Sequence, residues 1–177
     1  MILSSNGHFP ASFMGMLAYA AAGISSGIAW FLRRKQSSDV RTMACITILE
    51  AFLFLDIVFN WRWTLHTAMV HFAIGHARYG QRRVVQTAAL AFLGVLCVYV
   101  LWATAHKLHG KTGMIVAVWG VLLSLACWCV EIISLHQIDA ILYRRVDGWI
   151  VIIPVWFTFC LMTAVGVQLP VVNATGL

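Results

Sequence analysis

Five long apolar runs, separated by short linkers, constrain the fold of this chain more than any other feature. The runs cover residues 11–32, 42–61, 87–105, 114–135 and 149–166. A run of ~17–25 mainly apolar residues has the length of a helix that crosses the hydrocarbon core of a bilayer. The sequence therefore predicts an all-α fold, a polytopic transmembrane helical bundle with about five spans, and a single domain over residues 1–177. Four spans, with one run lying flat or re-entrant, is the alternative.

Composition and charge agree with a membrane protein and exclude an ordinary soluble domain. Apolar residues make up 62% of the chain and charged residues 10%, against ~45–50% and ~25% in a soluble domain. The net charge of +6 resides in short Lys and Arg clusters beside the apolar runs, where cations meet anionic lipid headgroups. No aromatic–basic groove or recognition motif accompanies these clusters. The expected partner is the phospholipid bilayer, and no nucleic acid is expected.

The distribution of basic residues favours one orientation. The first ten residues contain no Lys or Arg, whereas Arg33, Arg34 and Lys35 directly follow the first run. Cytoplasmic loops carry an excess of such residues, so the N-terminus is predicted outside, and this pattern also differs from that of a cleavable signal peptide. The linker between Arg62 and Arg83 is basic as well and would lie outside, so the loops do not all agree.

The linker over residues 64–83 has a helical period. Thr64, Thr67, His71, Gly75 and Arg78 recur every three or four residues and form a polar stripe. This pattern is typical of an amphipathic helix at the membrane interface, or of a long extension of the second span.

A ridge of small residues lies on the first run. Gly23 and Gly27 have the GxxxG spacing, and Ala20 precedes them by three residues. Such a ridge lets another helix approach closely, so we expect it to pack against a helix of this chain or of another subunit.

Three of the six carboxylates lie inside apolar runs: Glu50, Asp56 and Glu131. A charged side chain at mid-bilayer costs at least ~2.5–3.5 kcal/mol, so such residues usually face the bundle and have partners. Helical phase places Asp56, Asn60 and Glu50 on one half of the second run, and a second cluster follows Glu131 in sequence. The sequence therefore predicts one convergent binding site between the second and fourth spans, made of Glu50, Asp56, Asn60, Glu131, His136 and Asp139.

Three uses of this site are compatible with the sequence. The acids can pair with Arg62, Arg144 or Arg145 and act structurally, or they can relay protons. A transition metal is another use, with the ligands Glu50, Asp56, Glu131 and His136. Haem b needs two axial His at similar depth, and the candidates are His136 with His71 or His66, and His106 with His109. The apolar runs contain neither His-x-x-x-His nor Glu-x-x-His.

Three segments together are similar to uncharacterised bacterial polytopic inner-membrane proteins. The segments are Glu50 to Asp56 with Asn60-Trp61-Arg62, then Tyr79-Gly80-Gln81-Arg82-Arg83, then Ser134-Leu135-His136-Gln137-Ile138-Asp139. The resemblance covers the second to fourth spans. It implies a bacterial inner-membrane location, and it implies no activity.

The small size and the lack of a soluble domain favour a non-enzymatic accessory subunit of a larger membrane complex. No complete catalytic constellation is present, and no catalytic residue is predicted. The expected partners are other membrane subunits or a second copy of the chain. A metal- or haem-binding redox protein and a proton-coupled transporter, each using the Glu/Asp/His cluster, are the alternatives.

Overall fold

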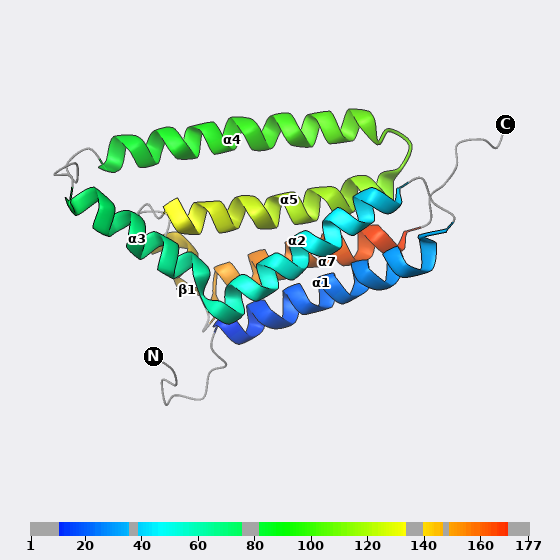
Figure 1. Ribbon diagram of the computed structural model, residues 1–177, viewed down its shortest axis with the longest axis horizontal. Coiled ribbons are helices and arrows are strands. Elements are labelled where there is room, and N and C mark those ends of the chain that lie inside the picture. The colour runs from blue at the N-terminus through cyan, green and yellow to red at the C-terminus, as the bar shows by residue number, and fades with distance from the viewer. Residues whose placement is uncertain (1–10, 36–38, 76–81, 134–139, 147–148, 170–177) are drawn as a thin grey trace.

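Four helices form the body of the molecule. The computed structural model describes residues 11–35, 39–75, 82–133, 140–146 and 149–169. The bundle (Figure 1) consists of α1 (Ala11–Arg33), α2 (Val40–Phe59), α5 (Thr112–Ile133) and α7 (Ile152–Gln168). Each helix packs against two others, in the order α1, α2, α5, α7 around the bundle. The prediction of a helical bundle is confirmed.

The helix directions follow from contacts between small and large residues. A Cβ placed on Gly15 would touch both Ile57 and Trp156, so the start of α1 meets the end of α2 and the start of α7. Thus α1 and α7 run in one direction, while α2 and α5 run in the other (Figure 1). The C-terminal ends of α2 and α5 consequently lie at the same end of the bundle, which we call the hairpin end.

Two further helices lie outside this bundle. Helix α3 (Trp61–Gly75) follows α2 almost directly and leaves the bundle obliquely, and α4 (Arg82–Lys107) returns alongside α5 (Figure 1). The inward face of α3 carries Arg62, His66 and Val70, whereas Thr64 and Thr67 are exposed. The predicted helical period of the linker is therefore present up to Gly75, in a helix separate from α2.

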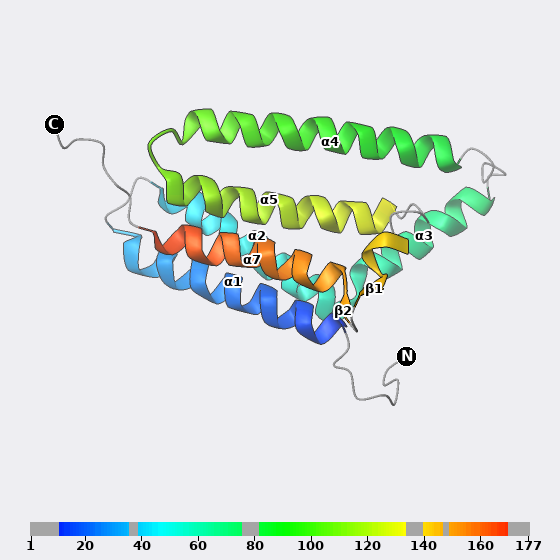
Figure 2. The ribbon, with the colours of Figure 1, turned by 180° about the vertical axis from the view of Figure 1, so that it is seen from behind.

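A short β-hairpin connects α5 to α7 at the hairpin end (Figure 2). Its strands are β1 (Arg145–Val146) and β2 (Trp149–Ile150), which pair antiparallel. The sequence predicts no strand, and it begins the fifth span at Trp149. Helix α7 instead begins at Ile152, because Trp149 and Ile150 are paired with the preceding strand.

A polar layer divides the core of the bundle in two. One apolar cluster, at the hairpin end, is centred on Tyr19, Leu53 and Trp156. The other is centred on Met43 and Val121. Between them, each of the four helices contributes one fully buried polar residue: Ser26, Glu50, Ser124 and Thr163.

Close approach of α5 and α7 depends on glycine. A Cβ on Gly120 would lie 2.5 Å from Oγ1 of Thr163 and 2.6 Å from its backbone nitrogen. The ridge on α1 also lies against a helix of the chain, because a Cβ on Gly23 would be 3.7 Å from Cβ of Glu50 and a Cβ on Gly27 would be 3.6 Å from Cγ2 of Thr47, both ordinary van der Waals contacts. Helix α2 therefore packs along the ridge, whose residues Ala20, Gly23 and Gly27 are half-buried.

Four helices are long and apolar enough to cross a membrane: α1 from Ser12, α2, α4 from Arg83, and α5. Helix α7 is apolar but has only 17 residues. At a rise of ~1.5 Å per residue it is somewhat shorter than a hydrocarbon core of ~30 Å. The outward faces of these helices carry many large apolar side chains, such as Ile24 and Ile28 on α1 and Phe92 and Val95 on α4.

Candidate functional site

The junction between α2 and α3 creates the first half of a buried charge network. Asn60 ends α2 in the left-handed conformation, with φ of 58°, which Asn tolerates better than most residues. The chain therefore turns sharply and brings Arg62 back over Asp56. The backbone N–H of Arg62 donates to Oδ1 of Asp56 at 2.9 Å, and its Nε donates to Oδ2 at 2.6 Å. The Asp56 carboxylate thus binds both the backbone at the start of α3 and the guanidinium group of Arg62.

Glu131 of α5 completes the network. Its Oε2 accepts from Nη1 of Arg62 at 2.5 Å and from the Tyr143 hydroxyl at 3.0 Å. Its Oε1 accepts from Nε1 of Trp156 at 3.3 Å and from the Cys127 thiol at 3.8 Å. Four donors from four segments therefore surround this one carboxylate.

Arg62 is the centre of the network and is almost fully buried. Burial alone would lower the pKa of this guanidinium, but the charges of Glu131 and Asp56 outweigh that effect and raise the pKa. Arg62 also lies over the ring of Trp156, with the guanidinium carbon 5.5 Å from the ring centroid. A charged group between two carboxylates links α2, α3 and α5 at the hairpin end.

Glu50 lies apart from this network, in the polar layer. It is fully buried, and neither carboxyl oxygen has a hydrogen-bond partner among the described residues. The Thr163 hydroxyl lies beside the carboxyl group but donates to the carbonyl oxygen of Phe159 at 3.2 Å. Glu50 therefore has a different environment from Glu131, although both are acids buried in the same bundle.

The structure brings together only part of the predicted site. Asp56 and Glu131 converge through Arg62, while Glu50 lies in the polar layer. Asn60 is exposed and acts through its backbone conformation. His136 and Asp139 lie outside the described residues. Arg62 was one of the partners expected for the acids from the sequence, whereas the donors Tyr143 and Trp156 were not predicted.

A metal or haem site finds little support in the part of the chain that the structure describes. These residues contain no group of three or more His, Cys, Asp or Glu side chains that could hold a metal ion. Nδ1 of His66 donates to the carbonyl oxygen of Ile132 at 3.1 Å, and His71, His106 and His109 are exposed.

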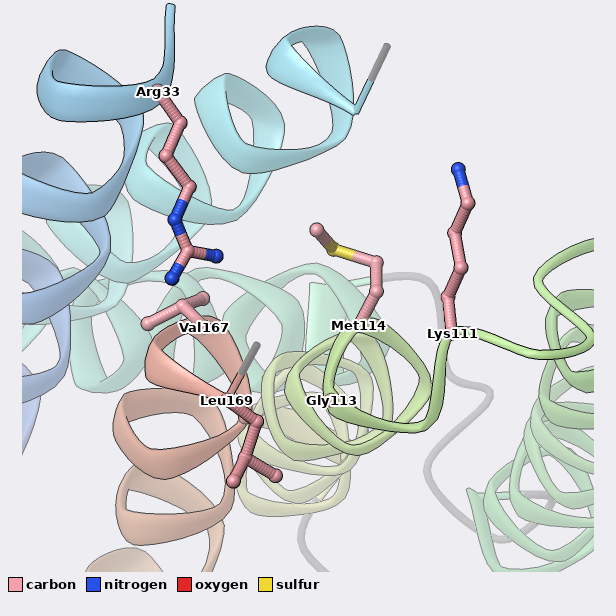
Figure 3. Close-up of a pocket in the computed structure, with 7 residues that line it drawn as sticks. Arg33, Lys111, Gly113, Met114, Val167 and Leu169 are labelled. Carbon is pink, nitrogen blue, oxygen red and sulfur yellow. The ribbon is translucent and has the colours of Figure 1, made fainter. Parts of the chain in front are cut away.

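A small pocket lies at the other end of the bundle, between the ends of α1, α5 and α7. In Figure 3, Arg33 extends towards Val167 at the end of α7, whereas Lys111 points away from α7. The Arg33 guanidinium donates to the carbonyl oxygen of Gln168 at 3.3 Å, and Nζ of Lys111 pairs with Oδ1 of Asp39 at 2.6 Å. Both cations therefore join helix ends, and the pocket contains no acid or His.

Comparison with protein-family models, curated proteins and solved structures gave no match for the chain. The class of the protein therefore follows from its own structure. It is a helical bundle with four helices of membrane-spanning length, a buried charge network at one end and a buried polar layer at its centre.

Proposed function

We propose that the protein is a bacterial inner-membrane protein that crosses the bilayer five times and acts as a non-enzymatic accessory subunit of a larger membrane complex. The observation that carries this proposal is the position of α4. This helix packs chiefly against α5, and no residue of its apolar span is buried. The other helices of membrane-spanning length each bury about a third of their apolar span or more.

The bundle does not need α4 for closure. Helices α1, α2, α5 and α7 already pack in a ring, so each has two neighbours without it. Helix α3 carries the chain away from the bundle, and α4 then presents a face with large apolar and aromatic side chains, including Phe92, Val95, Tyr99 and Trp102. Aromatic residues of this kind are enriched at protein interfaces. We therefore infer that a helix of another membrane subunit packs against α4.

The charge network supports a structural rather than a catalytic use of Asp56 and Glu131. Both acids are bonded to Arg62, and Glu131 has three further donors. An acid that is held in this way stabilises the hairpin end of the bundle and is not available as a base or as a metal ligand.

The proposed orientation places the N-terminus and the hairpin end outside. The opposite end then faces the cytoplasm, and it carries Arg33, Arg34 and Lys35 after α1 together with Lys107 and Lys111 around the α4–α5 turn. Two short loops rich in Lys and Arg on one side agree with the positive-inside rule. Helix α7 is then the fifth span, and local thinning of the bilayer accommodates its short length.

Site-specific photo-crosslinking in the native membrane tests this proposal. A crosslinking residue in place of Val95, which is 71% exposed on α4, should give one discrete adduct. The matched control replaces Ile24, which is 63% exposed on α1 and faces away from the bundle. It should give lipid adducts only. An adduct with a different membrane protein supports the accessory role, and an adduct with a second copy replaces it with self-association. Lipid adducts alone at Val95, together with a monomer in native mass spectrometry, would refute the proposal.

A further inference from the structure

The polar layer at the centre of the bundle is built from one residue of each helix. Ser26, Glu50, Ser124 and Thr163 are all 0% exposed and separate the two apolar clusters of the core. Four helices that pack around one acid and three hydroxyls form a defined site, whereas four independent polar residues would have no reason to lie at the same level.

The hydroxyl groups of this layer leave it rich in acceptors. Ser26 donates to the carbonyl oxygen of Gly23 at 3.0 Å, and Thr163 donates to that of Phe159 at 3.2 Å. Their protons thus point to their own helices, and their lone pairs remain. Both oxygens of Glu50 are buried without a partner among the described residues, and so is the Ser124 hydroxyl, which can donate one hydrogen bond and accept two. A group of acceptors with too few donors is satisfied by a ligand that brings positive charge.

No described charged group faces Glu50 from the helices packed against it. A Cβ on Gly23 of α1 would lie 3.7 Å from Cβ of Glu50, and the Thr163 hydroxyl of α7 lies beside its carboxyl group. Cys160, three residues before Thr163 on α7, lies next to Ser124 of α5. The ion pairs of the described residues involve Asp39, Asp56 and Glu131 and leave Glu50 out. An ionised carboxylate in such a place would lack both hydration and a counter-charge, which is strongly unfavourable.

We propose that Glu50 is a proton-binding site at the centre of the bundle. The carboxylate takes up one proton and becomes a neutral carboxylic acid, whose O–H then donates to a hydroxyl lone pair of the polar layer. A proton fits better than a larger cation because the helices are tightly packed at this level. A Cβ on Gly120 of α5 would lie 2.5 Å from Oγ1 of Thr163 on α7, and a Cβ on Gly23 of α1 would already reach van der Waals contact with Cβ of Glu50, at 3.7 Å. This role is separate from the partner surface on α4.

Infrared spectroscopy of the purified protein in lipid nanodiscs tests for the proton. The wild type should show the carbonyl band of a protonated carboxylic acid at neutral pH, with a shift in deuterated water as the proton exchanges. The Glu50→Gln variant should lose this band completely. The matched control is Glu131→Gln, which removes the other deeply buried Glu but should retain the band, because Glu131 is paired with Arg62.

A chemical probe gives a second measurement that needs no variant. Dicyclohexylcarbodiimide adds to protonated carboxyl groups in an apolar environment without a leaving group, so one equivalent should add to Glu50 and none to Glu131, as located by mass spectrometry. The proposal is overturned if the band remains in Glu50→Gln, if the carbodiimide adds to Glu131 and not to Glu50, or if the wild type has no such band. Loss of the band and of the adduct on addition of Na⁺ would replace the proton with a metal cation.

Discussion

Replacement of Arg62 by Leu should destabilise the protein more than any other exchange of a single basic residue among those the structure describes. The guanidinium holds two carboxylates, with Nε 2.6 Å from Asp56 and Nη1 2.5 Å from Glu131. Leu retains the backbone N–H that donates to Asp56 but leaves both carboxylates without their counter-charge. The buried network would then have two negative charges and no cation.

The size of the effect follows from the burial of all three side chains. Removal of one partner from a buried ion pair costs about 3–5 kcal/mol, because the remaining charge is neither hydrated nor paired. The two pairs share one guanidinium, so their contributions do not add, and the same range applies to the network. A chain of about 150–250 residues loses ~2–4 °C in Tm for each kcal/mol. The expected decrease in Tm is therefore roughly 6–20 °C.

Thermal unfolding in detergent, followed by tryptophan fluorescence, measures this decrease, and Trp156 reports directly because it contacts both Arg62 and Glu131. The control is Arg144→Leu. This exposed Arg lies at the same end of the bundle, so its loss should change stability by no more than ~0.5 kcal/mol. The triple variant Asp56→Asn, Arg62→Leu, Glu131→Gln should recover much of the loss, because it removes the unpaired charges.

Two results would refute this reasoning. A change of one kcal/mol shifts the Tm by ~2–4 °C. If the Tm of Arg62→Leu lies no further than this below that of the wild type, the network contributes little to the stability of the fold. If the triple variant is no more stable than Arg62→Leu alone, the loss comes from packing of the long Arg62 side chain and not from unpaired charge.

Three further predictions concern the backbone and the topology. Gly120→Ala should lower the Tm, because the added Cβ overpacks against α7 at a cost of about 1–3 kcal/mol. The control Gly94→Ala, whose Cβ would meet nothing within 4 Å, should be neutral or stabilising, and equal shifts of the two in thermal unfolding would contradict the packing argument. Asn60 has φ of 58°, a left-handed conformation that Gly adopts freely and Val does not. By the same measurement Asn60→Gly should therefore be tolerated, while Asn60→Val should cost about 1–2 kcal/mol. Equal stability of the two variants would contradict this reading of the turn. In a variant without native thiols, His109→Cys and Val146→Cys should react with an impermeant maleimide from opposite sides of the membrane, Val146→Cys from outside; labelling of His109→Cys from outside would invert the orientation.

Apolar run length predicted most of the fold, because a helix of membrane-spanning length needs little beyond a continuous apolar stretch. Five of the six long helices correspond to the predicted runs, with ends shifted by a few residues. The hairpin was missed because Trp149 and Ile150 are apolar and continue the fifth run. Their strand conformation depends on pairing with Arg145 and Val146, which no local period indicates.

Helical phase and the scarcity of acids were sufficient to predict the part of the candidate site that lies within the apolar runs. Asp56 and Glu131 were selected by depth, and Arg62 was a candidate partner because it lies at the end of the second run. Tyr143 and Trp156 carry no such signal, since they lie 12 and 25 residues from Glu131 in sequence and meet it only in the folded chain. The ridge of Gly23 and Gly27 shows the same limit, because small residues indicate close approach but not which helix approaches.

The two buried glutamates of the bundle differ because of the donors around each, and this difference separates structure from chemistry in the molecule. Glu131 meets a cation and three further donors, so both of its oxygens have partners within the protein. Glu50 lies beside the Thr163 hydroxyl, which donates to Phe159, and neither of its oxygens has a partner among the described residues, so a proton is the simplest ligand that satisfies it. A partner on α4 would leave the polar layer untouched, since that helix lies outside the four-helix ring. The crosslinking and infrared experiments therefore succeed or fail independently. A crosslinked partner at Val95 together with a carbonyl band from Glu50 would mean that one protein has both an accessory role and a proton held inside the bundle.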